Sequence, residues 1–250
     1  MLKLVYECGG KVEDNLFVTD PGCKIIHITK PTNFANDLFK EFNIANTNEF
    51  ESIGEFNARL CYLTFNSNKK TNLTDTIIDL GHLSVFNDIH ITFLIAGISD
   101  EVTKEFVSHN EAKVSRLTSS KTNAQNNTLY RVFGNDNSVS IQKKYINKFI
   151  SLRQEYVDDQ YSTHNISNVR EPIEIINMFN LGTKCSVFTF SMNIKDYHKL
   201  FIGRIPEHGN EHDVILICKK MCRLLHELFP KLIREVEWYE KANNNTKYNE

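Results

Sequence analysis

The chain has 250 residues, of which 41% are hydrophobic and 24% charged, and its formal net charge at pH 7 is −2. This composition can bury a sizeable core, and it excludes a largely disordered chain as well as a protein that binds nucleic-acid polymers or anionic membranes through its overall charge. Any phosphate binding must come from a local cluster of residues, so a nucleotide is favoured over a polymer as the ligand.

The cysteines and the apolar runs indicate an intracellular protein. The six cysteines are scattered without Cys-x-x-Cys spacing, and residues 1–10 hold no apolar run long enough for a signal peptide. No stretch approaches the roughly 20 apolar residues that are needed to span a bilayer. We therefore expect a soluble, cytoplasmic protein with reduced cysteines and no membrane partner.

The residues before position 82 are predicted to form short strands and then helices. Residues 2–6 and 24–28 have the pattern of strands. A core-facing helix after Pro31 is predicted from apolar residues at helical spacing, namely Phe34, Leu38, Phe39 and Phe42. Residues 58–65 form a second amphipathic element, and a helix that carries Ile77, Ile78 and Leu80 is expected to end at Gly81.

Residues 82–122 hold the densest group of signals. A strand is predicted because apolar residues (Ile89, Ile91, Phe93 and Ile95) alternate with mixed ones (His90, Thr92 and Leu94). Gly97 is expected to break this strand, and Ser99 can cap a helix on which Val102 and Phe106 share one face. Residues 109–121 then combine many hydrogen-bond donors with little apolar periodicity, which suits an anionic ligand.

The second half is predicted to contain two loops, three helices and a strand. The loops are residues 123–137 and 158–171. A helix of about 18 residues from Ser140 is predicted from the spacing of Ile141, Tyr145, Phe149, Leu152 and Tyr156. A strand at 187–192 precedes a helix from Asn193 to near Pro206, and a last helix at 211–229 is stopped by Pro230.

Strands and helices mix without the regular alternation of a doubly wound sheet. We therefore expect an α+β fold in which long helices pack on a mainly antiparallel sheet. Residues 1–240 are expected to form a single domain, and residues 241–250 a disordered tail.

Two blocks of the sequence resemble the flavin-dependent thymidylate synthases, the ThyX family. The first block, GHLSVFNDIHITFLIAG followed by SHN, offers His82, Ser84 and Phe86, a strand and a helix, and then Ser108, His109 and Asn110 where the family has its Arg-His-Arg signature. The second block, TFSMNIKDYHKLFIGRIPEHGNE, places Asn193, Arg204 and His208 on family positions. ARLCY at 58–62 is similar to the family's Ala-Arg-Val-Ser-Tyr. Together these segments cover roughly residues 55–230 in the family's order.

The resemblance implies a diverged thymidylate synthase that methylates or hydroxymethylates dUMP, with FAD as cofactor and methylenetetrahydrofolate and NADPH as co-reactants. It implies a homotetramer whose subunits share the site. It assigns catalysis to Arg204. The implied cofactor-binding residues are His82, Ser84, His109, Asn110, Asn193 and His208. The implied substrate-binding residues are Glu105, Thr118, Ser120 and Arg204.

The departures from the family pattern fall on charged positions. Ser108 and Asn110 replace both signature arginines, Ser120 replaces a third, and a fourth position falls near Ile176. A family glutamine is Glu105 and a family acid is Arg116. In the family these arginines grip the flavin and the dUMP phosphate through paired, charge-assisted bonds that Ser or Asn cannot replace. A catalytically inactive homologue that serves as a binding or structural subunit is therefore the alternative. Lys113, Arg116 and Lys121 could compensate if they point inward.

Structural explanations remain open for several of these residues. His82 can be a partly buried histidine, and His109 can stabilise the end of a helix. Asn193 can cap the helix that follows it, and Arg204 can be an exposed surface residue.

A zinc site is a separate alternative. The segment His208–His212, HGNEH, matches the His-x-x-Glu-His pattern of inverted metalloproteases, but Gly209 lies inside the pattern and only a short segment follows for a third ligand. Cys218 and Cys222, one helical turn apart, are read as core residues and not as metal ligands. We therefore expect no metal.

Overall fold

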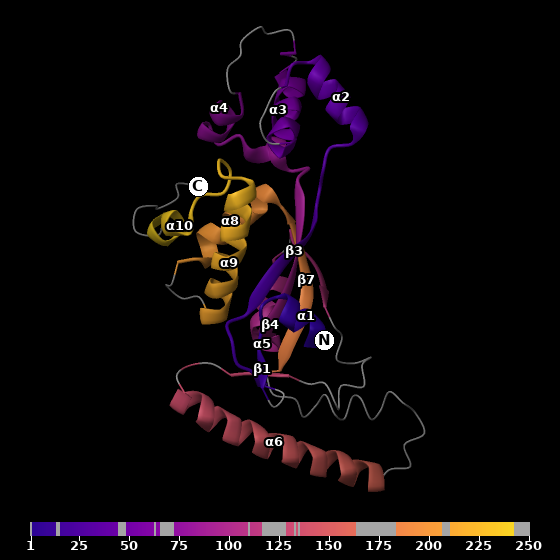
Figure 1. The fold of residues 1–250 in the computed structure, drawn as a ribbon, viewed down its shortest axis with the longest axis vertical. Coiled ribbons are helices and arrows are strands. Elements are labelled where there is room, and N and C mark those ends of the chain that lie inside the picture. The colour runs from indigo at the N-terminus through magenta and orange to yellow at the C-terminus, as the bar shows by residue number, and fades with distance from the viewer. Residues whose placement is uncertain are drawn as a thin grey trace. The chain divides into compact units, whose positions relative to one another are not determined.

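A computed structural model describes residues 2–13, 16–44, 49–62, 64–65, 73–109, 111–116, 129–132, 134, 136–163, 184–206 and 211–242 (Figure 1). Strands and several helices combine in an α+β fold, as predicted. The described residues divide into two compact units. Unit 1 is drawn from Met1–Lys24, Leu94–Asn110 and Val114–Phe190, and unit 2 from Ile25–Phe93, Glu111–Lys113 and Ser191–Glu250. The single domain over 1–240 stays a prediction.

A four-stranded sheet has the order β3-β4-β7-β5. Its strands are β3 (Gly22–Ile28), β4 (His90–Ser99), β7 (Cys185–Asn193) and β5 (Lys113–Arg116). The predicted alternation in β4 is confirmed, because Ile89, Ile91, Phe93 and Ile95 are all fully buried. The donor-rich segment 109–121 is in part the edge strand β5, on which Lys113 and Arg116 are exposed.

Gly97 does not end β4, so that prediction is wrong. The strand continues to Ser99 because Gly97 adopts a φ of +90°, where a Cβ would lie 2.1 Å from the ring of Phe17. This local change of backbone direction buries the neighbouring Ala96 and Ile98 together. Ser99 then caps α5 (Asp100–Val107) as predicted, since its side chain accepts a hydrogen bond from the amide of Val102.

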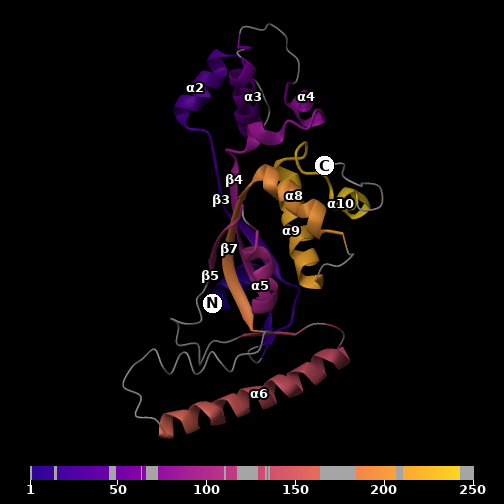
Figure 2. The same ribbon diagram turned by 180° about the vertical axis from the view of Figure 1, so that it is seen from behind.

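Unit 1 contains a small second sheet in the order β1-β2-β6. Its strands are β1 (Val12–Glu13), β2 (Leu16–Phe17) and β6 (Tyr130–Arg131), with β1 antiparallel and β6 parallel to β2. The helix α5 lies against β7, where Phe106 contacts the rings of Phe188 and Phe190 (Figure 2). Residues 2–6, predicted as a strand, form α1 (Leu2–Glu7), because the helical spacing places both Val5 and Cys8 in the core cluster around Phe17.

The long helix α6 (Asp136–Thr163) has 28 residues, where the sequence predicted about 18. It extends into residues that were assigned to loops on either side. Its inner face packs Ile146, with Val139 and Ile150, against Leu16 and Tyr130. Most of the apolar residues from which this helix was predicted do not lie on the inner face. Ile141 is 59% exposed, Tyr145 62% and Leu152 56%.

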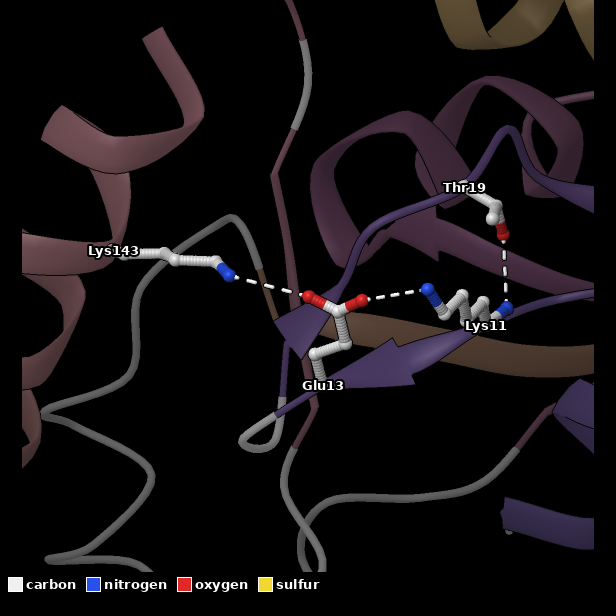
Figure 3. Close-up of polar contacts among 4 residues, drawn as sticks. All are labelled: Lys11, Glu13, Thr19 and Lys143. Atoms are coloured by element: carbon white, nitrogen blue, oxygen red, sulfur yellow. Dashed lines mark hydrogen bonds and ion pairs between the residues drawn. The ribbon is translucent and has the colours of Figure 1, made fainter. Parts of the chain in front are cut away.

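Polar contacts fix the start of α6 to the small sheet. The carboxylate of Glu13 in β1 lies 3.4 Å from Lys143 in α6 and 2.7 Å from Lys11, whose amide donates to the hydroxyl of Thr19 (Figure 3). These groups are partly exposed, so they orient α6 more than they stabilise the fold.

Unit 2 is mainly helical. Its helices are α2 (Asn33–Glu41), α3 (Glu49–Tyr62), α4 (Leu73–Asp79), the 3-10 helix η1 (Leu83–Phe86), α8 (Ile194–Arg204), α9 (His212–Leu228) and α10 (Val236–Ala242). The helices after Pro31, before Gly81, after Asn193 and before Pro230 are confirmed. The predicted core face of α2 is confirmed only in part, because Phe39 is buried whereas Phe34 is 72% exposed. The helix α10 was not predicted, and it packs on both α8 and α9 (Figure 1). None of the described helices has the length and apolar character needed to cross a membrane.

The structure agrees with the predicted free thiols and with the predicted core positions of Cys218 and Cys222. All six cysteines are free thiols. Cys218 and Cys222 are fully buried on the apolar face of α9, as core residues should be, and burial raises the pKa of Cys222 to about 12.

Candidate functional site

The first candidate segment is the turn that carries His82 and Ser84 in unit 2. Gly81, with a φ of +73°, ends α4: its amide donates to the carbonyl of Ile78, and the amide of His82 donates to the carbonyl of Ile77. His82 thus lies at the entry to η1, and Ser84 lies within it. Both side chains are exposed, and neither makes a side-chain hydrogen bond within the part of the chain that the structure describes. The partly buried structural role considered for His82 is therefore wrong.

Asn57 and Gly54 of α3 hold η1 in place. The side-chain amide of Asn57 donates to the carbonyl of Val85 at 2.8 Å and to the carboxylate of Asp88 at 3.1 Å. Phe86 is fully buried against Gly54, where a Cβ would lie 1.9 Å from the ring. Sequence reasoning missed Asn57 and Gly54. Their only signal was that they precede the ARLCY segment.

The second candidate segment is α8, also in unit 2. Asn193 caps this helix: its side-chain oxygen accepts from the amide of Asp196 at 2.9 Å, and its NH₂ group donates to the Asp196 carboxylate. The structural explanation considered for Asn193 is therefore confirmed. Arg204 ends the helix, where it is half-buried and already has an interaction partner.

Unit 2 brings these two segments together. The helices η1 and α8 pack on each other, and the amide of Ile194 at the start of α8 donates to the carbonyl of Ile89 at 2.9 Å. The exposed turn with His82 and Ser84 is therefore fixed to the helix that begins after Asn193. The two segments lie near the starts of the two sequence blocks, about a hundred residues apart in the chain.

The other predicted residues lie in unit 1 or outside the described residues. Glu105 lies half-buried in α5 and His109 half-buried just after it, both in unit 1 and both with partners of their own. Asn110, Thr118, Ser120 and His208 lie outside the described residues, as do Lys121 and Ile176.

Arg59, in the ARLCY segment, has a structural environment. Its guanidinium contacts the carboxylate of Glu55 at 2.7 Å and 2.8 Å, and both side chains are buried within α3. It also donates to the carbonyl of Thr64. This pair lies in the helix on which η1 packs.

The zinc pattern gains no support from the described residues. Glu211 is the N-cap of α9 and His212 its first residue, so the described part of the pattern lies at the start of a helix and not within one. In the described segments no three His, Cys, Asp or Glu side chains gather in a way that could hold a metal.

Comparison with known proteins decides the family. A family model described as "Thymidylate synthase complementing protein" (Thy1, the ThyX family) matches residues 44–231, which include η1, α8 and both sequence blocks. The chain belongs to this family. The resemblance inferred from the sequence is thus confirmed.

A solved ThyX-like structure has the same fold. The crystal structure of the UMP/dUMP methylase PolB from Streptomyces cacaoi, bound with 5-Br UMP, matches with a TM-score of 0.62 and 10% identity over 91% of this chain and 99% of that chain. At this identity the match concerns the fold alone. A search of curated proteins finds no match.

The ThyX family is generally flavin-dependent. The hydrogen-bonding side chains of His82, Ser84 and Asn193 in unit 2 can therefore be compared with the groups that a flavin ring presents. The exposed imidazole of His82 and hydroxyl of Ser84 suit the neutral, hydrogen-bonding edge of a flavin ring, which presents both donors and acceptors. The amide of Asn193 is largely used by Asp196. The chemistry of the His82 and Ser84 side chains is compatible with the ring of the cofactor. They lack the paired arginines with which the family grips phosphate groups.

Proposed function

We propose that this ThyX-family protein modifies a pyrimidine nucleotide by methylation or hydroxymethylation of dUMP, with FAD as cofactor, methylenetetrahydrofolate as one-carbon donor and NADPH as reductant. The observation that carries the proposal is the packing of η1 on α8, because it joins the two segments that match the family. The nucleotide bound in the PolB structure supports a pyrimidine substrate.

In this proposal the chain's own residues bind and orient. His82 and Ser84 hold the flavin ring from the exposed turn, and Arg204 supplies a cation from the end of α8. Glu105, Thr118 and Ser120 are proposed to contact the substrate. The flavin, when bound, supplies the hydride. Holding both reactants in one geometry is then the main contribution of the protein, so no enzyme nucleophile is required.

The visible absorption spectrum of the purified protein tests the flavin step. After incubation with FAD and removal of unbound flavin, wild-type protein should retain flavin absorption, and His82→Ala or Arg204→Ala should lose it. Retention should be followed by an assay of dUMP turnover with methylenetetrahydrofolate and NADPH. Wild-type protein that stays colourless would refute the flavin proposal.

Asn193 allows a sharper version of this experiment, because its role as a helix cap can be separated from a role in binding. Serine also caps helices, so Asn193→Ser should keep the stability of α8 while it removes the amide. If the amide binds flavin, Asn193→Ser folds normally but retains less flavin than wild type. If it only caps, Asn193→Ser behaves as wild type and Asn193→Ala loses stability.

A catalytically inactive binding or structural subunit is the second candidate. Ser108 and Asn110 favour it, because they stand where the family has arginines. Each lost charge-assisted bond costs about 1.5–3 kcal/mol, which corresponds to tenfold or more in affinity. Under this alternative FAD does not stabilise the protein against heat, whereas the enzyme requires that it does.

We also propose that the chain assembles with copies of itself, as a homotetramer in the family's manner. Support comes from the outer face of α6, where Ile141, Tyr145 and Leu152 expose large apolar surface on one helix. Light scattering coupled to size exclusion should show a tetramer for wild type and a smaller species for Ile141→Asp with Leu152→Asp. A wild-type monomer would contradict this proposal and leave the flavin test unaffected.

A further inference from the structure

Two buried cations in unit 1 make no ion pair with the residues that the structure describes. Arg153 in α6 is 8% exposed and Lys184, just before β7, is 7% exposed. Charged side chains lose much of their hydration on burial, so they are normally paired with an opposite charge. Across the segments that the structure describes, neither side chain comes within salt-bridge distance of a carboxylate.

Tyr130 lies directly opposite Lys184. The two residues form an antiparallel bridge, and the amide of Cys185 beside it donates to the carbonyl of Leu129 at 2.7 Å. Residues that face each other across such a bridge project to the same side. Tyr130 is 2% exposed, and its hydroxyl has no hydrogen-bond partner among the described residues.

The helix α6 presents Arg153 to the same region. Ile146 packs in the core cluster with Tyr130, and Arg153 lies about two turns further along the same face. The contact of Lys143 with Glu13 fixes the start of this helix on the small sheet (Figure 3). The Nε atom of Arg153 is also buried without a partner among the described residues.

The charges of these groups act on one another. Burial lowers the pKa of Lys184, and the nearby Arg153 lowers it further, against the opposing effect of Asp100 at the start of α5. Arg153 likewise acts on the buried Tyr130, whose pKa burial raises. The cluster therefore combines two cations with one carboxylate, and it has two unused hydrogen-bond donors.

We propose that Arg153, Lys184 and Tyr130 bind an oxyanion of the phosphate class. A guanidinium, an ammonium group and a phenol are complementary to the oxygens of such an anion, which would satisfy the unused donors and neutralise the buried charge. The anion can be free phosphate or the phosphate group of a nucleotide. The site goes beyond the proposed function, because it requires no flavin and uses none of the residues assigned to catalysis or cofactor binding.

Calorimetric titration of the full-length protein with inorganic phosphate, dUMP and deoxyuridine tests the proposal. Arg153→Gln and Lys184→Gln should each weaken phosphate or dUMP binding by about tenfold or more. Tyr130→Phe should weaken it severalfold. Lys148→Gln is the matched control, because Lys148 is an exposed cation on the same helix, and it should bind as wild type does.

The outcomes separate the two sources of the anion. Binding of both phosphate and dUMP, in competition and without binding of deoxyuridine, assigns the site to the phosphate group itself. Binding of dUMP alone, lost in the charge variants, assigns it to a nucleotide. The proposal is overturned if wild type binds neither ligand at millimolar concentration or if the variants bind as wild type does. If both charge variants fail to fold, Tyr130→Phe decides, since it removes one hydroxyl group from the same ring.

Discussion

Replacement of Glu55 by alanine should destabilise the protein strongly, because it leaves the guanidinium of Arg59 buried. Both side chains are less than a tenth exposed, and their contacts at 2.7 Å and 2.8 Å form a well-aligned pair. Without Glu55, the described contact that remains for Arg59 is the carbonyl of Thr64 at 3.4 Å. Removing one partner of a buried ion pair costs about 3–5 kcal/mol. For a chain of this size, that corresponds to a fall in melting temperature of roughly 6–20 °C.

The double variant Glu55→Leu with Arg59→Met is the control, because it removes both charges and keeps the volume. Such replacements of buried pairs are often neutral or stabilising, so the double variant should be at least as stable as wild type. Urea denaturation measures the free energy of unfolding for all three proteins. A loss below about 1 kcal/mol in Glu55→Ala would refute the reasoning, since it is the value of a solvated surface pair.

Three further predictions concern Gly54, Asn57 and His198. Gly54→Ala should lower the free energy of unfolding by about 1–3 kcal/mol in thermal denaturation, because its Cβ would lie 1.9 Å from the ring of Phe86. Asn57→Ala should speed amide hydrogen exchange across residues 82–89 and leave exchange in α9 unchanged, since it removes two hydrogen bonds that hold this turn. Burial lowers the pKa of His198 to about 4 from its ordinary 6.5, so the unfolded chain takes up a proton between these values that the folded chain does not. The free energy of unfolding should therefore fall by about 3 kcal/mol as the pH drops from 6.5 toward 4, and urea denaturation of His198→Phe should show a flatter pH dependence.

Local patterns predicted the elements whose signal is unambiguous. The alternation from Ile89 to Ile95 has a period that only a strand can use, and it produced β4. The caps at Ser99 and Asn193 were also predictable, because a capping bond joins residues only three positions apart.

The errors arose where contacts between distant residues decide the structure. A short apolar run such as residues 2–6 fits a strand or a helix, and what selects α1 is the burial of Val5 and Cys8 beside Phe17. The spacing of Ile141, Tyr145 and Leu152 showed a helix but not which of its faces is covered. Gly97 predicted the end of a strand. The ring of Phe17 packs so closely on this position that only glycine fits, and the sequence does not show that contact.

The candidate site was predictable only in part, for the same reason. The blocks around His82 and Asn193 were recognisable as motifs, and the contact between η1 and α8 then joined them. Asn57, which fixes that turn, belongs to no motif. The pairing of Tyr130 with Lys184 follows from a bridge between segments more than fifty residues apart, so no local pattern could indicate it.

If the anion site proposed above is correct, the buried cations weigh against a purely structural role for the chain. A protein that only kept the ThyX fold would be at least as stable with apolar residues at positions 153 and 184, because a buried charge that makes no ion pair with the described residues is costly. Their cost is accounted for if a bound anion supplies the missing charge, since ligand binding stabilises the folded state. The family's signature positions carry Ser108 and Asn110, and unit 1 instead holds Arg153 and Lys184 in its interior. The loss of the signature arginines is therefore not, by itself, evidence that the chain has lost the ability to bind phosphate.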